Sequence, residues 1–262
     1  GVLTTTEGRD IDLVDRDRHP PRDVTAPAAP SPRAAAASPA LPQKPGPWSA
    51  TTCNFCGTPE ESMQDLAGRR KVRCPGCKSL DQNRVFLWCY ERFIQPEFDL
   101  AGKRVLLVAP TDGEAGYFRS RAEVTTCDTR KTASVDRQLG LANMPEVADG
   151  SFDAVIAIGV LQSCPDDEGV LNEVQRVLSP GGRAFLQVPL LRNADTEAIQ
   201  SGAARSAEEA AEELRTGAIR RYGDLSLLRS LQRRFLVKTY HGYDPVTLGT
   251  GAIFCGIKDP GR

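Results

Sequence analysis

The sequence predicts an α/β protein in which a doubly wound, mainly parallel sheet follows a small cysteine-rich module. After about residue 100, short apolar runs typical of buried strands alternate with amphipathic helical runs. Two Cys-x-x-Cys pairs precede this alternation, and the first fifty residues show almost no periodic apolar pattern. We therefore expect a tail over 1–50, a cysteine module over 51–82, a connecting helix over 83–100 and the sheet domain over 101–258.

The tail combines a charged stretch with a stretch rich in Ala, Pro and Ser. Neither can bury enough apolar surface to offset backbone ordering, which predicts disorder, as a linker or as a docking peptide. The net charge of −1 argues against nucleic-acid binding. No apolar run is long enough to span a membrane, and no signal peptide is visible, so we expect a cytoplasmic protein with reduced thiols.

The expected elements follow from periodicity and from capping residues. The predicted helices cover 85–98, 114–121, 166–178, part of 194–216 and 225–236, and the predicted strands cover 104–109, 123–127, 152–158 and 183–188, with an antiparallel edge pair over 235–240 and 251–257. Of the predicted helices, we expect the one in 194–216 to form a solvated surface or a substrate lid. In such sheets, ligands bind at the carboxyl ends of the parallel strands.

Four cysteines form two knuckles separated by seventeen residues: Cys53, Cys56, Cys74 and Cys77. This spacing is typical of a structural Zn²⁺ site, because two knuckles can direct four thiolates at one ion. Gly57 and Gly76 permit the tight turns. Two disulfides or a redox dithiol are the alternatives. The remaining cysteines (Cys89, Cys127, Cys164 and Cys255) lie in apolar stretches and are expected to pack in the core, with Cys164 closest to the expected ligand crevice. The basic run between the knuckles is expected to be a solvated loop.

The stretch 151–189 contains Ser-Phe-Asp-Ala-Val-Ile, then Val-Leu-Gln-Ser-Cys-Pro-Asp-Asp-Glu, and then Val-Leu-Ser-Pro-Gly-Gly-Arg-Ala-Phe-Leu-Gln-Val-Pro. It closely resembles the central block of class I S-adenosylmethionine-dependent methyltransferases of the type 11 kind. The cysteine module followed by Ser-Leu-Asp-Gln-Asn-Arg (79–84), and the late Arg-Arg-Tyr-Gly-Asp (220–224), resemble a bacterial subgroup with an N-terminal zinc ribbon. The resemblance implies a seven-stranded, Rossmann-like methyltransferase fold.

The resemblance also implies a site for S-adenosylmethionine. Its implied residues are a loop with Ala109, Thr111 and Gly113 facing the amino-acid end of the cofactor, Asp128 on the ribose hydroxyls, Asn143 and Met144 beside the adenine, and Gly159 at the start of the transfer loop. The helix after the first loop would offer its amino terminus to the cofactor carboxylate. Transfer of a methyl group from a sulfonium depends mainly on positioning, sometimes with a general base.

Several family positions carry other residues here. Of the usual three glycines in the first motif only Gly113 remains, and histidines common in the transfer loop are absent. The candidate catalytic residues are Gln162, Ser163, Tyr222 and His241. The expected function is therefore methyl transfer to a small-molecule acceptor. The alternatives are a catalytically degenerate subunit that binds and supports or regulates a protein partner, possibly a homologue, and an enzyme of another reaction class on the same fold.

Overall fold

A computed structural model of the chain describes residues 52–66, 68–131, 135–191, 195–198 and 217–261. All of them belong to one compact unit. The predicted tail over 1–50, and most of the predicted helix within 194–216, lie outside the described residues. Within the described ranges, no helix has both the length and the apolar character needed to cross a membrane.

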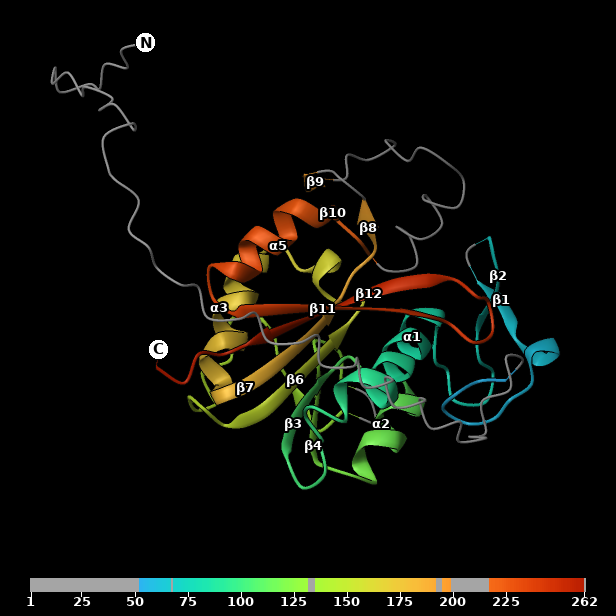
Figure 1. Cartoon of the computed structure of the whole chain (residues 1–262), viewed down its shortest axis with the longest axis horizontal. Helices are drawn as coiled ribbons and strands as arrows, with labels where there is room; N and C mark the ends of the chain where they lie inside the picture. The colour runs from blue at the N-terminus through green and yellow to red at the C-terminus, as the bar shows by residue number, and fades with distance from the viewer. Residues whose placement is uncertain (1–51, 67, 132–134, 192–194, 199–216, 262) are drawn as a thin grey trace, which may run out of the picture. The chain divides into compact units, whose positions relative to one another are not determined.

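The main sheet has seven strands in the order β11-β12-β7-β6-β3-β4-β5 (Figure 1). Their bounds are β3 (Arg104–Val108), β4 (Glu123–Asp128), β5 (Arg137–Gln138), β6 (Phe152–Ile158), β7 (Leu178–Gln187), β11 (Leu236–Tyr243) and β12 (Thr250–Ile257). Strands β3 to β7 pair in parallel, and β12 pairs antiparallel with both β7 and β11. This confirms the predicted doubly wound, mainly parallel sheet of the methyltransferase type, including its antiparallel edge pair.

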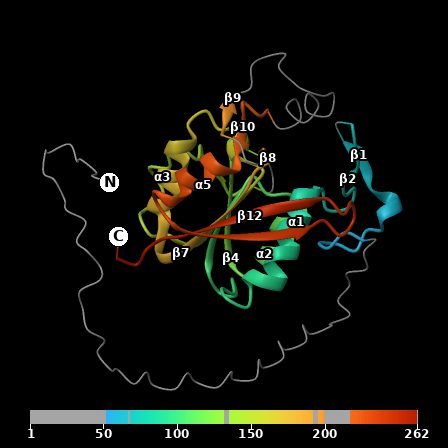
Figure 2. The ribbon, with the colours of Figure 1, turned by 45° about the horizontal axis from the view of Figure 1, so that its top comes forward.

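Helices cover both faces of this sheet (Figure 2). On one face, α1 (Asp81–Cys89), the π-helical turn η2 (Tyr90–Ile94) and α2 (Asp112–Arg119) pack over a core that includes Phe86, Phe118 and Phe185. On the other face, α3 (Asp167–Val177) and α5 (Asp224–Gln232) enclose a second core. The interior strands are apolar on both sides, as expected for a sheet covered on two faces.

Helix α3 forms as the sequence predicts. The Asp166 carboxylate accepts a hydrogen bond from the Gly169 amide at 2.8 Å and caps the helix. The predicted apolar face is buried against the sheet, with Val170, Leu171 and Val174 each at most 2% exposed. Strand β7 starts directly after the helix, at Leu178, and carries the Pro-Gly-Gly segment into the sheet.

The connecting helix begins earlier than its apolar pattern predicts. The structure starts it at Asp81 rather than at residue 85, because the Asn83 side chain accepts the Leu80 amide at 2.9 Å and closes the first turn. This turn brings Asn83 and Arg84 into the helix as buried residues. The early start matters for the site, because the added turn lies beside the carboxyl ends of the strands.

Several short elements were not predicted. The cysteine module contains η1 (Glu60–Ser62) and a hairpin of β1 (Gln64–Leu66) and β2 (Arg69–Arg73), so the basic run is a strand and not a loop. Lys71 of this run donates to Glu60 at 2.6 Å. A three-stranded sheet of β8 (Leu190–Leu191), β10 (Arg220–Gly223) and β9 (Glu197–Ala198) lies after β7, and η3 (Leu161–Ser163) follows β6.

Asp153 lies near the start of β6, at the amino ends of the parallel strands, and it holds β3 in place. Its carboxylate accepts the Arg104 amide at 3.0 Å, the Arg104 guanidinium at 2.8 Å and the Ser179 hydroxyl at 3.0 Å. These bonds, chiefly from the Arg104 side chain, lower the pKa of Asp153 to about 2. Its role is therefore in the framework of the sheet.

Replacing Asp153 by Asn should lower the free energy of unfolding at pH 7 by about 1 kcal/mol, after discounting for the partly exposed arginine. Because the folded pKa lies below the unfolded value, this contribution is present above about pH 4 and disappears as the pH falls toward 2. Urea unfolding of both proteins between pH 2.5 and 7 measures the difference. A constant difference across that range would contradict the assignment.

Candidate active site and metal centre

A pocket of about 540 Å³ lies at the carboxyl ends of β3, β4 and β6, and we call it the central pocket. Among its lining residues are five of the predicted site residues: Ala109, Thr111, Asp128, Gly159 and Ser163. Topology explains this grouping, because parallel neighbouring strands end at the same sheet edge. The volume lies within the range of small-molecule and cofactor sites. Gly113, Asn143 and Met144 do not line this pocket.

The loop after β3 keeps a left-handed turn without a glycine. Ala109, at the family's first glycine position, has φ of +45°, and its amide donates to the Cys127 carbonyl at 2.7 Å. An alanine in this region costs about 1 kcal/mol relative to its preferred conformations. The packing of β3 against β4 offsets that cost, so the turn survives the loss of the glycine.

The amino end of α2 is already hydrogen bonded within the protein. Thr111 caps the helix by accepting the Glu114 amide at 3.3 Å, and the Glu114 carboxylate accepts the Thr111 amide at 3.0 Å. Glu114 is 2% exposed, and burial raises the pKa of its carboxyl group. The Gly113 amide donates to the Cys77 carbonyl at 2.8 Å. The resemblance implies that these amides bind a cofactor carboxylate. In this structure the Glu114 amide bonds to the cap residue Thr111, and the Gly113 amide bonds to the cysteine module.

The cysteine module packs so closely against Gly113 that it leaves no room for a side chain there. A Cβ atom at this position would lie 2.9 Å from the Cys77 sulfur and 3.1 Å from the Phe55 side chain. Real Cβ atoms essentially never show the first distance, and the second is tighter than most real contacts, so glycine lets the knuckle approach the helix this closely. The one glycine that remains of the family's motif therefore serves packing between the module and α2.

Asp128 ends β4 at the rim of the central pocket. Its Oδ1 accepts the Arg130 amide at 2.9 Å and the Thr129 hydroxyl at 3.2 Å. Within the described ranges, no donor reaches Oδ2. The side chain is 15% exposed, so this oxygen can accept hydrogen bonds from a ligand's hydroxyl groups.

Helix α1 supplies a wall that the sequence did not predict. Leu80, Gln82 and Asn83 line the central pocket, and the Gln82 amide lies against Gly159. A Cβ atom at Gly159, whose φ is +70°, would lie 1.9 Å from the Gln82 Nε2 atom. Gly159 therefore serves two needs, a left-handed turn after β6 and close contact with Gln82. In the sequence, the one indication of this wall is the segment Ser-Leu-Asp-Gln-Asn-Arg (79–84), which follows the second knuckle.

The four catalytic candidates do not meet in one place. Ser163 lines the central pocket, and its hydroxyl donates to the Val160 carbonyl at 3.0 Å. Gln162 is buried beneath it and donates to the Gly159 carbonyl at 2.8 Å. The Tyr222 hydroxyl donates to Asp167 at 2.8 Å, and burial raises its pKa well above the usual range. His241 lies on β11, in a different hollow.

Two further hollows lie beside the central pocket. The side cleft, of about 790 Å³, lies between α5 and the ends of β11 and β12 and includes Trp88, His241 and Phe254. The connecting groove, of about 270 Å³, shares Gln82 with the central pocket and Gln187 with the side cleft. The three hollows are therefore neighbours along the carboxyl edge of the sheet.

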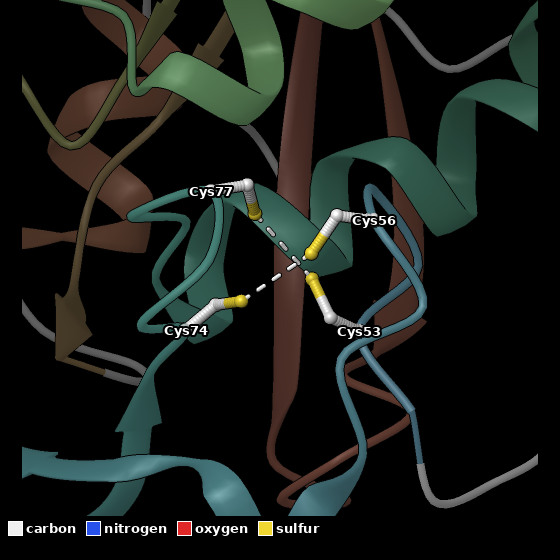
Figure 3. Close-up of side chains that lie close together, drawn as sticks. All are labelled: Cys53, Cys56, Cys74 and Cys77. Atoms are coloured by element: carbon white, nitrogen blue, oxygen red, sulfur yellow. Dashed lines mark hydrogen bonds between the residues drawn. The ribbon is translucent and has the colours of Figure 1, made fainter.

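The four module cysteines converge, with all four sulfurs within 4.8 Å of one another (Figure 3). The sulfurs of Cys53 and Cys77 are 3.6 Å apart, and those of Cys56 and Cys74 are 3.5 Å apart. A tetrahedral zinc site with bonds of about 2.3 Å requires sulfur separations of about 3.8 Å, so this donor set fits such an ion. All eight cysteines of the chain are free thiols, which disfavours the predicted alternative of two disulfides.

The two knuckles share one backbone pattern. The Gly57 amide donates to the Cys53 carbonyl at 2.8 Å, and the Lys78 amide donates to the Cys74 carbonyl at 3.0 Å. Both donors have left-handed backbones, with φ of +74° and +62°. Gly76 is needed for another reason, since a Cβ atom there would lie 2.8 Å from the Thr58 hydroxyl of the other knuckle. Glycine thus permits the close approach of the knuckles.

The other cysteines have no such arrangement. Burial raises the pKa values of Cys89 and Cys127 to about 12 and that of Cys255 to about 11, which suits inert core residues. Cys164 is half-buried and lines the central pocket, as its loop position predicts. Burial raises the pKa of Cys164 too, which disfavours the thiolate form.

A buried ion pair joins the module to the sheet domain. The Arg84 Nε and Nη2 atoms donate to the two carboxylate oxygens of Asp244 at 2.7 and 2.8 Å, and both side chains are 0% exposed. Arg84 also donates to the Val72 and Ser79 carbonyls at 3.0 and 3.2 Å. One guanidinium therefore links β2, the second knuckle, α1 and the turn between β11 and β12.

Comparison with known proteins gives a family match within the sheet domain. Residues 101–186 match the family model described as a methyltransferase domain. This part of the sheet domain is therefore similar to methyltransferase domains. A ubiquinone biosynthesis O-methyltransferase of Xanthomonas oryzae pv. oryzae is 32% identical over 110 residues, which cover 36% of this chain and 46% of the relative. The chain thus spans about half the length of this relative.

Two further proteins are similar to parts of the chain. The human thiol S-methyltransferase TMT1A is 51% identical over 43 residues, covering 16% of this chain and 18% of that protein. The crystal structure of the Burkholderia thailandensis 1,6-didemethyltoxoflavin-N1-methyltransferase is similar at 15% identity, with a TM-score of 0.46, over 66% of this chain and 85% of that one. The cysteine module lies outside the matched family region of the methyltransferase domain.

Removing Arg84 should destabilise the protein strongly. Arg84→Ala leaves Asp244 buried without its partner, and we expect a loss of about 3–5 kcal/mol in the free energy of unfolding. The control Arg70→Ala, at an exposed position of β2, should change it by less than about 0.5 kcal/mol. The paired variant Arg84→Met/Asp244→Leu should recover part of the loss, because no unpaired charge stays buried although two backbone amides lose the Asp244 acceptor. Urea unfolding measures all three variants, and similar losses for Arg84→Ala and Arg70→Ala would contradict the assignment.

Proposed function

We propose that this protein is an S-adenosylmethionine-dependent methyltransferase that acts on a small-molecule acceptor. The observation that carries the proposal is the central pocket, which remains open at the strand ends of a methyltransferase domain although most of the family's glycines are absent. A pocket filled by the protein's own side chains would argue instead for the degenerate subunit.

The lining residues suit the parts of the cofactor. Asp128 presents an unbonded carboxylate oxygen to the ribose hydroxyls. Leu139 and Leu141 add apolar surface beside it for the adenine, in place of Asn143 and Met144. Thr111 and Ala109 form the loop that would face the amino-acid end. Because the Gly113 and Glu114 amides are already bonded, a polar side chain such as Gln82 would have to bind the cofactor carboxylate.

When bound, S-adenosylmethionine supplies a methyl group on a sulfonium sulfur, and its transfer to a nucleophile breaks the carbon–sulfur bond, leaves the electron pair on sulfur and releases any proton that the nucleophile carried. The chain's own contribution is positioning. Gly159 and Ser163 bound the pocket after β6, and Gln82 closes it on the α1 side. These groups hold the reacting atoms and exclude water from them.

The relatives support the acceptor class. The matched proteins are named as methyltransferases, one for ubiquinone biosynthesis and one for thiols, which supports a small-molecule acceptor. This chain spans about half the length of the first relative, so the relative's acceptor does not carry over to it directly. The degenerate, partner-binding subunit remains the alternative, and the closed amino end of α2 is the observation that favours it.

Binding of S-adenosylmethionine distinguishes these functions. We expect a micromolar Kd by isothermal titration calorimetry. Asp128→Ala should weaken binding roughly 10- to 150-fold, since hydrogen bonds to a charged group contribute about 1.5–3 kcal/mol. The control Glu146→Ala removes an exposed carboxylate outside the pocket and should leave the Kd unchanged. Absent or millimolar binding by the folded wild-type protein would favour the partner-binding subunit.

We also propose that the four cysteines hold a structural Zn²⁺ ion. Elemental analysis of protein purified without chelators should give about one zinc ion per chain. Cys56→Ser should lower the zinc content and the Tm, because metal binding contributes to folding of the module. Cys164→Ser is the matched control and should keep both values. A folded wild-type protein that contains no zinc would refute the metal site.

A further inference from the structure

Gln187 is a buried polar side chain without a partner, and nothing in the framework explains it. It is the last residue of β7 and is 7% exposed. Within the described ranges, its Oε1 atom has no hydrogen-bond partner. A buried acceptor left in this state costs about 1–3 kcal/mol. Buried polar groups of this kind are normally satisfied by a ligand or an ordered water.

The position of Gln187 points to a ligand that reacts at the central pocket. Its carbonyl accepts the Gly159 amide at 2.8 Å, so it lies directly beside the loop that bounds the central pocket. Gln187 also lines both the connecting groove and the side cleft. The groove reaches the central pocket through Gln82. A molecule lying in the cleft and groove therefore has one end close to the site proposed for the methyl donor.

The side cleft has walls suited to a flat apolar molecule. Trp88, Phe254 and Leu228 contribute apolar surface to it. Tyr243 and Leu225, also in its lining, are 36% and 43% exposed, which is unusual for large apolar side chains in a concave site. The rings of Trp88 and Tyr243 lie 4.6 Å apart, so part of the cleft is an aromatic surface.

Charge in these two hollows is sparse. The side cleft contains Asp224 and His241 as its ionisable acid and base, and the connecting groove contains Arg69 and Asp81, which pair with each other. No unpaired cation of the described residues lines either hollow. An anionic acceptor would lose hydration here and could gain only the His241 imidazole as a partner among the described lining residues. The walls instead match an uncharged molecule.

We propose that the side cleft and connecting groove bind the methyl acceptor, and that this acceptor is an uncharged ring compound with a hydroxyl or amine proton that it donates to Gln187 Oε1. The inference rests on the proposed methyltransferase function. Gln187 acts as a specificity-determining residue, because it recognises a hydrogen-bond donor that an otherwise equal apolar molecule lacks.

Two probes of the same shape test this recognition. 2-Naphthol carries a hydroxyl donor, and 2-methoxynaphthalene has the same ring system without one. Titration calorimetry of the full-length wild-type protein should show 2-naphthol binding at least 10-fold tighter. In Gln187→Met, which keeps the side-chain length and removes the amide, the two probes should bind equally. Gln138→Met, an exposed glutamine on β5, is the matched control and should keep the wild-type preference.

A second variant locates the probes. Leu228→Trp adds bulk to the cleft wall and should weaken both probes at least 10-fold, with no effect on the binding of S-adenosylmethionine. Gln187→Met should also raise the Tm, because it removes the unsatisfied buried oxygen, and this confirms that the variant folds. Equal binding of the probes to the wild-type protein, a preference that survives in Gln187→Met, or no binding of either probe would overturn the inference.

The two proposals fail separately. The probes are titrated without S-adenosylmethionine, so their result does not depend on cofactor binding. If S-adenosylmethionine binds and the probes show no preference, the acceptor site is wrong and the methyltransferase function stands. If S-adenosylmethionine does not bind, the methyltransferase function fails whatever the probes show.

Discussion

The buried pair of Arg84 and Asp244 is the interaction on which the arrangement of this protein depends. Two charges at 0% exposure are stable only because each is fully hydrogen bonded, the guanidinium to the carboxylate and to two carbonyls of the cysteine module. Asp244 in turn accepts the Val246 and Thr247 amides at 3.2 and 3.0 Å. The pair therefore holds the module and α1 against the turn between β11 and β12. This position of α1 places Gln82 and Asn83 in the lining of the central pocket.

The cysteine module replaces part of what the family's glycine-rich loop supplies. In this chain the amino end of α2 receives a carbonyl from Cys77, and Gly113 is retained for that contact. Ala109 nevertheless keeps the left-handed turn after β3. The cysteine module therefore packs against the first turn of α2, where the resemblance would place the cofactor.

The fold was predictable because its signals are local and strong. The apolar runs of β3 and β6 and the capped, one-faced pattern of α3 fix their elements with few alternatives, and the Cys-x-x-Cys pairs fix the metal-type cluster. The walls of the site were not predictable in the same way. Gln82 reaches Gly159, and Gln187 borders two hollows, only through packing between segments far apart in the chain. Single-sequence periodicity contains no information on such contacts, and the early start of α1 depends on one Asn83 side chain.

The contact between Cys77 and Gly113 has a consequence for how this protein can be divided. The residue that contributes a sulfur to the cysteine cluster also contributes its carbonyl to the first turn of α2. A fragment that begins at the first strand of the sheet would expose that turn, the Phe118 face of α2 and one side of the ligand hollow to solvent. The two parts are therefore best expressed together, and a hybrid with another amino-terminal part would need a small residue at position 113.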